Sequence, residues 1–339
     1  MIVKTRPYHL ALKHTFTIAH GSRNTTPIIL VELEQNEHIG YGEVSLPPYL
    51  VENQQTAISF YKSLDFNCFN HSEVQWDELL NYVHQSSAHN NAAKASLDIA
   101  IHDLKGKINS QPCWKMFGSD PQKMPLNSCT IGIDKEDIII KKIEEAKSFK
   151  VLKIKLGTGN EQAFINSLRK HTDKPLYIDV NQGWSDIKYA EEMAYWLKEK
   201  GAVLLEQPMH KDNLEGHALL KEKNILPIFA DESFQKSSDL KNIQDAFDGI
   251  NIKLMKCGGL RPAMEIIKLA RKQNMKILMG CMNESSCATM AAAALAPLCD
   301  YADLDGPSLI NNNPFEDYNM AEGKIILSNK PGLGIKKNI

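Results

Sequence analysis

Short apolar runs, each closed by a charged residue, recur through the second half of the chain. The runs read VLKIKLG, LYIDVNQGW, VLLEQP, PIFADES and GINIKLM. The charged residues that close them are Lys155, Asp179, Glu206, Asp231 and Lys253. The steps between them are 24, 27, 25 and 22 residues, the length of one strand, one helix and the connecting loops. This period predicts a repeating βα unit with parallel strands.

Further apolar runs extend the pattern in both directions. LNSCTIGID at residues 126–134 precedes it, and KILMGCMNES and YADLDGP follow it, which makes eight strands in all. Eight parallel strands with helices between them favour a closed (β/α)-barrel, in which the carboxyl ends of the strands meet at one mouth and form the active site. An open doubly wound sheet is the alternative, but the sequence contains no GxGxxG or GxxxxGK[ST] motif to support it.

The amino-terminal third of the chain has a different pattern. Strand-like alternation at residues 2–12 and 28–34, with HIGYGEV as a hairpin partner for the second run, precedes helical stretches near 54–64, 73–84 and 91–107. Strands first and helices after predict an α+β module.

These patterns divide the chain into three parts. We expect the α+β module at residues 1–115 and the barrel at 116–308. The β-like run GKIILSNKPGLGI lies in the last part, 309–339, which we expect to leave the barrel and return to the first module. The length of 339 residues suits a barrel of roughly 200–250 residues with a smaller module.

Composition narrows the class of ligand. The net charge is −2 and no basic run with interleaved aromatic residues occurs, so we expect neither nucleic acid nor an anionic membrane as a partner. The start of the chain lacks the apolar core of a signal peptide, and we expect no membrane span. Seven cysteines without a CxxC pair indicate reduced thiols. These features predict a cytoplasmic protein with a small neutral or zwitterionic ligand.

Three carboxylates close three successive strands and predict a metal site. Asp179, Glu206 and Asp231 occupy equivalent positions in the period, where no histidine or cysteine occurs. Oxygen-only ligands favour a hard cation, and three carboxylates with room for water or substrate suit Mg²⁺, with Mn²⁺ as an alternative. A helix cap or a surface ion pair is an equally good interpretation of any one acid. Their shared position argues against that interpretation for all three.

Two lysines flank the acidic strands and predict proton transfer. Lys155 and Lys253 end the second and the sixth strand, which lie across the mouth of a closed ring of eight. A substrate carboxylate held by Mg²⁺ would place its α-carbon between the two amines. One amine then removes the α-proton to form an enediolate, and the other delivers a proton to the opposite face.

Two further lysines lie close to this pair in the sequence. Lys153 shares the strand face of Lys155, so its like charge is expected to lower the pKa of Lys155. A solvated lysine face on an edge strand is the alternative for this pair. Lys256 is interpreted as a solvated or structural lysine.

The same motifs resemble a known family. KIK, IDVNQGW, LLEQP, FADES and NIKLMKCGG are similar to the enolase superfamily, muconate-lactonizing subgroup, and the match runs through most of the barrel. The amino-terminal module resembles the capping domain of that family. The resemblance implies Mg²⁺ with lysine bases. It assigns Lys155 to the R-configured and Lys253 to the S-configured centre.

Other motifs narrow the resemblance to one activity. Asp303 and Asp305 in YADLDGP resemble the pair with which dipeptide epimerases hold a substrate ammonium group. The polar loop at residues 20–26 is expected to fold over a neighbouring site. The sequence AHGSR, at residues 19–23, resembles the segment that supplies an arginine to the glutamate side chain in L-Ala-D/L-Glu epimerases. By the same resemblance, the residues that contact the substrate are Arg23, Thr130, Lys153 and the backbone around Cys281.

The expected function is therefore Mg²⁺-dependent epimerisation of a small dipeptide of the L-Ala-D/L-Glu type at its carboxy-terminal residue, in the salvage of cell-wall peptides. An N-acylamino acid racemase, an o-succinylbenzoate synthase or a cycloisomerase would share the lysines and the metal site, but needs no paired aspartates for an ammonium group. A barrel that only binds a ligand is the alternative from another class, and it needs no base on each face. Homo-oligomerisation is possible and is left open.

Overall fold

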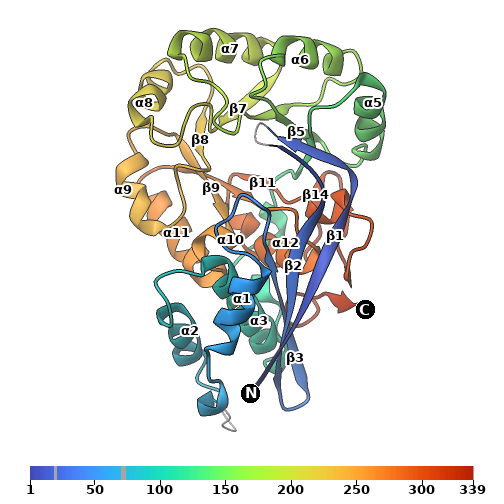
Figure 1. Cartoon of the computed structure of the whole chain (residues 1–339), viewed down its shortest axis with the longest axis vertical. Helices are drawn as coiled ribbons and strands as arrows, with labels where there is room; N and C mark the ends of the chain where they lie inside the picture. Colours follow the sequence, from blue (N-terminus) through green and yellow to red (C-terminus); the bar gives the residue numbers. More distant parts are fainter. Residues whose placement is uncertain (19–20, 70–73, 339) are drawn as a thin grey trace.

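The computed structural model describes residues 1–18, 21–69 and 74–338. A barrel of strands and helices occupies one end of the molecule, and a long antiparallel sheet with its own helices occupies the other (Figure 1). The fold is the expected (β/α)-barrel with an amino-terminal α+β module. In the described part of the chain, no helix combines the length and the apolar character needed to cross a membrane.

The amino-terminal module consists of a three-stranded antiparallel sheet covered by helices. Its strands, in the order β1-β2-β3, are β1 (Ile2–Ile18), β2 (Gly21–Gln35) and β3 (His38–Ser45). Its helices are α1 (Gln54–Lys62), α2 (Trp76–Gln85) and α3 (Asn91–Ile108). Helix α3 lies against β3 because Gly42 leaves room for it, and a Cβ atom there would lie 1.9 Å from the carbonyl oxygen of Ser96.

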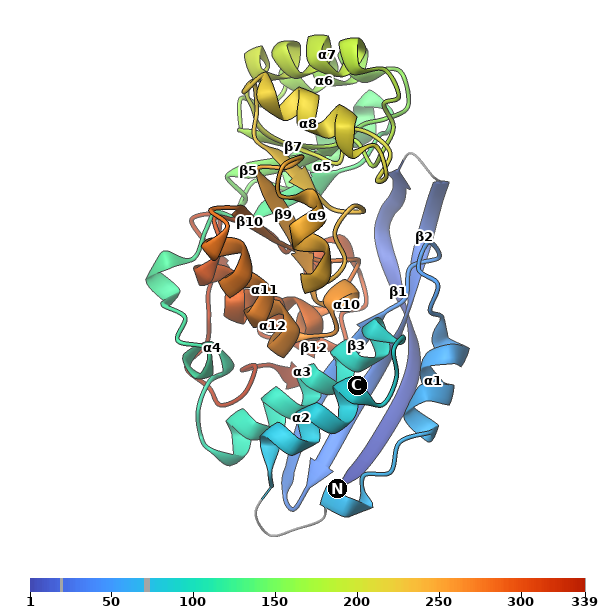
Figure 2. The same ribbon diagram turned by 90° about the vertical axis from the view of Figure 1, so that its left-hand side faces the viewer.

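The first two strands are longer than the sequence predicted. Residues 21–26, which we expected to form a flexible loop, belong to β2, because Arg23 pairs with Phe16 across the β1–β2 ladder. The hairpin extends from the amino-terminal module to the barrel (Figure 2). His20, in the same expected loop, lies outside the described residues.

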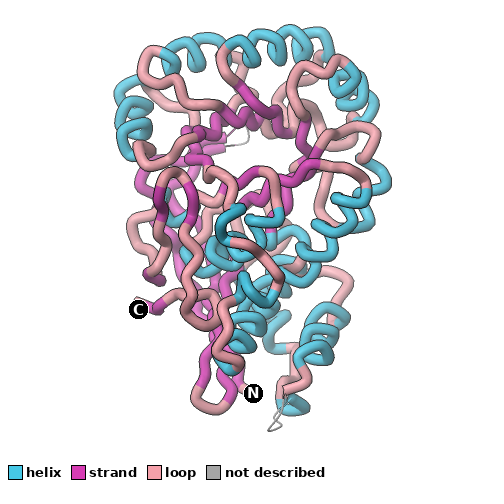
Figure 3. The backbone as a smooth tube through the Cα atoms, turned by 180° about the vertical axis from the view of Figure 1, so that it is seen from behind, coloured by secondary structure: helices cyan, strands magenta, loops and turns pink. Residues whose placement is uncertain are grey.

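Eight parallel strands form the barrel. They are β4 (Ser128–Ile131), β5 (Val151–Lys155), β6 (Leu176–Asp179), β7 (Ala202–Glu206), β8 (Ile228–Ala230), β9 (Gly249–Lys253), β10 (Lys276–Gly280) and β11 (Tyr301–Asp303). Neighbours in sequence are neighbours in the sheet, and a bridge between Asn127 and Ala302 joins the last strand to the first. Figure 3 shows the ring of strands with helices outside it.

Helices connect the strands on the outside of the barrel. They are α5 (Glu136–Glu145), α6 (Glu161–Arg169), α7 (Ile187–Glu199), α8 (Leu214–Glu222), α9 (Leu240–Ile243), α10 (Leu254–Cys257), α11 (Leu260–Lys272) and α12 (Ser286–Leu295). Every residue of α12 is buried, because this helix packs against β3 and α3 of the amino-terminal module. The two parts of the molecule therefore share one continuous hydrophobic core.

Inside the barrel, side chains form layers along the strands. Residues 151, 153 and 155 of β5 are one alternate set, which points inward. The lowest layer is apolar and consists of Val151, Tyr177, Leu204, Phe229 and Leu278. This apolar plug closes the barrel beneath the charged residues at the strand ends.

The segment after the barrel contacts the amino-terminal module. It contains β12 (Phe315–Glu316), β13 (Met320–Ala321), β14 (Lys324–Ile325) and β15 (Lys336–Lys337), while α4 (Cys113–Met116) links the module to the barrel. The amide of Leu333 donates to Asp103 Oδ1 at 2.7 Å, and the carbonyl of Gly332 accepts from Cys113 at 2.7 Å. The exact domain boundaries at residues 115 and 308 stay predictions.

Candidate active site

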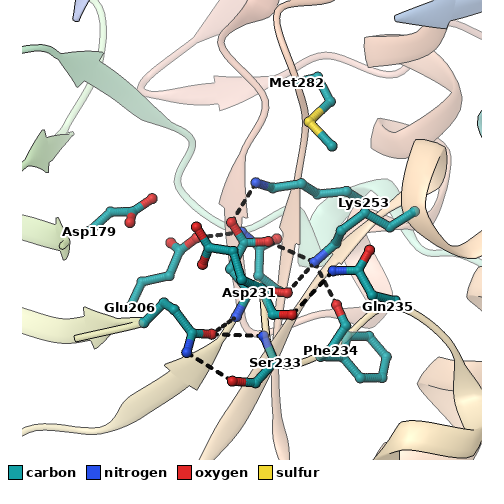
Figure 4. Close-up of polar contacts among 12 residues, drawn as sticks. Asp179, Glu206, Asp231, Ser233, Phe234, Gln235, Lys253 and Met282 are labelled. Carbon is teal, nitrogen blue, oxygen red and sulfur yellow. Dashed lines mark hydrogen bonds and ion pairs between the residues drawn. The ribbon is translucent and has the colours of Figure 1, made fainter. Parts of the chain in front are cut away.

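The charged residues of the βα period meet at the mouth of the barrel. Lys155, Asp179, Glu206 and Lys253 are the last residues of their strands, and Asp231 directly follows β8. The three acidic side chains converge from neighbouring strand ends (Figure 4). Above them opens a cleft of about 470 Å³ between the barrel mouth and the β1–β2 hairpin. The predicted site residues that line it are Arg23, Thr130, Lys153, Lys155, Asp231, Lys253, Cys281, Asp303 and Asp305.

The three acids form a compact buried cluster. One oxygen from each of Asp179, Glu206 and Asp231 lies within 4.8 Å of the others, and their residues are 0, 0 and 4% exposed. Burial and the charge of Asp179 raise the pKa of Glu206 to about 8. Such crowding of oxygen donors suits a divalent cation, which would relieve the repulsion. The residues present therefore fit a hard metal ion.

Neighbouring amides orient two of these carboxylates. Asn251 Nδ2 donates to Glu206 Oε1 at 2.8 Å, and the backbone amide of Asn181 donates to Asp179 Oδ1 at 3.0 Å. Each carboxylate keeps a second oxygen for other partners.

Lys155 and Lys253 lie on opposite flanks of the acidic cluster. Lys155 Nζ is 2.6 Å from Asp179 Oδ2, and Lys253 Nζ is 2.7 Å from Asp231 Oδ2. Burial lowers the pKa of Lys253, but the Asp231 carboxylate outweighs it and leaves the pKa above its usual value. A substrate carbon above the cluster would therefore have an amine on each side.

Lys153 lies one layer deeper and contacts carboxylates from three strands. Its Nζ is 2.8 Å from Glu206 Oε2, 2.8 Å from Asp303 Oδ2 and 3.1 Å from Asp179 Oδ2. Burial lowers the pKa of Lys153, but these carboxylates outweigh it and raise the pKa well above its usual value. Lys153 is thus a fixed buried cation, and the alternative of a solvated lysine face is wrong.

The paired aspartates lie at the same mouth, Asp303 as the last residue of β11 and Asp305 two residues beyond it. Asp303 Oδ1 accepts from Ser128 Oγ at 2.6 Å, and Asp305 Oδ2 accepts from the amide of Thr130 at 2.6 Å. Burial and the charge of Asp303 raise the pKa of Asp305 to about 7. A cationic group of a ligand would stabilise both carboxylates.

Arg23 and Cys281 line the cleft from the other side. The Arg23 guanidinium lies over the rings of Phe16 and Tyr49, with centroid distances of 4.9 and 5.6 Å, and donates to Asn283 Oδ1. The Cys281 thiol is 4.0 Å from Asp305 Oδ1. The structure therefore brings all the predicted site residues to one place.

Two family models cover nearly the whole chain. One, described as "Enolase C-terminal domain-like", matches residues 139–338. The other, "Mandelate racemase / muconate lactonizing enzyme, N-terminal domain", matches residues 2–118. The chain belongs to the enolase superfamily.

Individual relatives within the superfamily agree with this assignment. An L-Ala-D/L-Glu epimerase from Bacteroides thetaiotaomicron is 45% identical over 98% of this chain and 86% of its own length. An L-Ala-D/L-amino acid epimerase from a Maribacter species is 36% identical over 100% of both chains. The crystal structure of a dipeptide epimerase from Enterococcus faecalis, complexed with Mg and the dipeptide L-Leu-L-Tyr, has a TM-score of 0.86, 31% identity and coverage of 98% of both chains.

Lys256 has a larger part in this enolase-superfamily site than the sequence suggested. It is 6% exposed, so it is a structural and not a solvated lysine. Its Nζ donates to Asp231 Oδ1 at 2.6 Å, to the Asp231 carbonyl at 2.7 Å and to the Phe234 carbonyl at 2.9 Å. Lys256 thereby fixes one oxygen of Asp231, while the other faces Lys253.

Several residues of the site were not predicted. They are Tyr49, Asn181, Glu232, Asn251, Met282 and Asn283. Asn181 and Glu232 directly follow the strand-end acids by one or two positions, so the βα period could have indicated them. Met282 and Asn283 follow β10, which ends at Gly280 and is not followed directly by a charged residue.

Proposed function

We propose that this protein is a Mg²⁺-dependent epimerase of dipeptides of the L-Ala-D/L-Glu type, acting at the α-carbon of the carboxy-terminal residue. The observation that carries the proposal is the position of Lys155 and Lys253, on opposite flanks of a buried cluster of three carboxylates. A site that only binds a ligand has no need for an amine on each side.

In the proposed reaction, the acids and the lysines of the cleft have separate roles. Asp179, Glu206 and Asp231 would hold Mg²⁺, which when bound supplies positive charge to stabilise the negative charge that develops on the substrate. Lys155 or Lys253, as the neutral amine, accepts the proton when the α C–H bond breaks. The opposite ammonium donates a proton to the other face, so the configuration inverts.

The remaining predicted residues fit the two ends of a dipeptide. Asp303 and Asp305 would accept hydrogen bonds from the amino-terminal ammonium, with Thr130 and Lys153 holding those carboxylates in place. The backbone at Cys281 would face the peptide or carboxylate group, and Arg23 would face the acidic side chain. The substrate of an N-acylamino acid racemase has no free α-ammonium, so the paired aspartates would have no such group to hold.

The cellular location, the pathway and the partners of the enzyme belong to the same proposal. We propose a cytoplasmic enzyme that salvages cell-wall peptides and that binds neither nucleic acid nor a membrane. The seven free cysteines support a reducing compartment. Homo-oligomerisation stays an open prediction.

Isotope exchange tests the proposal directly. The purified protein with Mg²⁺ and L-Ala-L-Glu in D₂O should replace the glutamate α-proton by deuterium and produce L-Ala-D-Glu, as followed by NMR. Lys155→Ala and Lys253→Ala should each abolish inversion, while each can retain exchange of the isomer whose proton faces the remaining lysine. Lys268→Ala, on the exposed face of α11, is the control. No deuterium uptake from any member of a broad dipeptide panel would refute the proposal.

A further inference from the structure

The arginine that faces the cleft is held by a neutral partner. Arg23 lies on β2, and its Nη2 donates to the side-chain oxygen of Asn283, which follows β10 of the barrel. The rings of Phe16 and Tyr49 lie against the same guanidinium at 4.9 and 5.6 Å. Two aromatic faces and one amide oxygen thus fix the plane and the direction of the guanidinium.

Asn283 is itself firmly positioned by the amino-terminal module. Its residue is 3% exposed, and its backbone carbonyl accepts from Ser45 Oγ at 2.7 Å. Thr26 Oγ1 lies 3.5 Å from the same side-chain oxygen that accepts from Arg23. A buried amide tied at both its backbone and its side chain cannot follow Arg23 if the arginine moves. Asn283 therefore presents its side-chain oxygen to Arg23 from a fixed position.

Because Asn283 is neutral, it does not neutralise the positive charge of Arg23. Within residues 1–18, 21–69 and 74–338, no carboxylate forms an ion pair with its guanidinium. Its Nε is buried and has no hydrogen-bond partner among the described residues. Two acids of the cleft are paired elsewhere, Asp231 with Lys253 and Lys256, and Asp303 with Lys153. An aspartate in place of Asn283 would occupy the same volume but neutralise the arginine.

We propose that Asn283 is a positioning residue that sets the preference for acidic dipeptides, because it orients Arg23 without neutralising it. Selectivity for a carboxylate side chain then depends on the amide as well as on the arginine. This inference rests on the proposed function, since it assigns Arg23 to the side chain of the epimerised residue.

The matched substrates L-Ala-L-Glu and L-Ala-L-Gln test the inference, because they differ in charge and hardly in shape. The measured quantity is the ratio of their kcat/KM values. Asn283→Asp should lower that ratio roughly 10- to 100-fold, the value of one charge-assisted hydrogen bond, mainly through a higher KM for L-Ala-L-Glu. Asn283→Ala, which removes the acceptor but leaves the charge, should lower the ratio less. Equal losses for both substrates in the two variants would reduce Asn283 to a structural residue.

A double-mutant cycle with Arg23→Met shows whether the effect passes through the arginine. In the Arg23→Met background, Asn283→Asp should leave the ratio unchanged. The same fall in both backgrounds would mean that the new charge acts on the substrate directly, which would overturn the inference. If the wild-type protein epimerises neither dipeptide, the proposed function fails. Calorimetric binding of the two dipeptides to the same four proteins would then still decide whether Asn283 controls the charge preference.

Discussion

Replacing Lys256 by methionine would remove a buried ammonium that holds a predicted metal ligand. Lys256 Nζ makes three hydrogen bonds, at 2.6 Å to Asp231 Oδ1, 2.7 Å to the Asp231 carbonyl and 2.9 Å to the Phe234 carbonyl. Methionine has a similar length but no donor. The change therefore leaves one buried carboxylate oxygen and two backbone carbonyls without this partner.

The expected cost is large for a single substitution. Removing one member of a buried ion pair destabilises a protein by about 3–5 kcal/mol. Asp231 keeps Lys253 at 2.7 Å from its other oxygen, which favours the lower end of this range. For a protein of 339 residues, we expect the melting temperature to fall on the order of 4–7 °C. Because a bound cation would restore positive charge beside Asp231, Mg²⁺ should raise the melting temperature of the variant more than that of the wild type.

Thermal unfolding followed by circular dichroism, in EDTA and in Mg²⁺, measures both effects. Lys268→Met is the matched control, because Lys268 is exposed on α11 of the same barrel. Its melting temperature should stay within a degree or two of the wild type in both buffers, since exposed substitutions change stability by about 0.5 kcal/mol or less. A Lys256→Met protein as stable as this control, or one that gains no more from Mg²⁺ than the wild type, would refute the reasoning.

Two predictions concern buried positions of β3, one facing the barrel and one facing α3. Burial, only partly offset by hydrogen bonds from Ser285, raises the pKa of Glu43 from 4.5 to about 7, so the stability contributed by protonated Glu43 is full below pH 4.5 and is lost as the pH rises through 7. The free energy of unfolding should therefore fall by about 3 kcal/mol over this pH range in the wild type and by much less in Glu43→Gln. Urea unfolding at pH 5 and pH 8 measures this fall, and an equal fall in both proteins would contradict the prediction. Gly42→Ala would place a Cβ atom 1.9 Å from the Ser96 carbonyl and should cost about 1–3 kcal/mol. His38→Ala, at the exposed start of the same strand, is its control in the same urea titration.

The period of the sequence was sufficient to predict the strand ends. A residue that closes a parallel barrel strand must lie at the mouth, whatever the details of the loops. Lys155, Asp179 and Glu206 therefore meet as expected, since each is the last residue of its strand. The inward alternation along β5 also placed Lys153 on the same side as Lys155, and both are buried.

The electrostatic environment of these groups was harder to predict. Lys153 lies two residues before Lys155 in the sequence, so we expected repulsion between the two ammonium groups to be the main electrostatic effect on this strand. In the structure, Lys153 has the carboxylates of Glu206 and Asp303 at 2.8 Å, and these come from strands that end 53 and 150 residues away along the chain. A charge two residues away on a strand is visible in the sequence, but these opposite charges, from strands two positions away in the ring, are not.

No repeat in the sequence predicts the contacts between the amino-terminal module and the barrel mouth. Asn283 meets Arg23 from 260 residues away, and this meeting depends on how far the β1–β2 hairpin extends over the mouth. Residues 20–26 were predicted to form a flexible loop because they are polar and small, but pairing of Phe16 with Arg23 extends the ladder between β1 and β2 into this segment. Repeated βα units thus determine where the strand-end acids and lysines meet, while the non-repeating module determines where Arg23 lies above them. Under the proposed function, substitution at Arg23 or Asn283 should therefore change the substrate preference while the acidic cluster and both lysines stay in place.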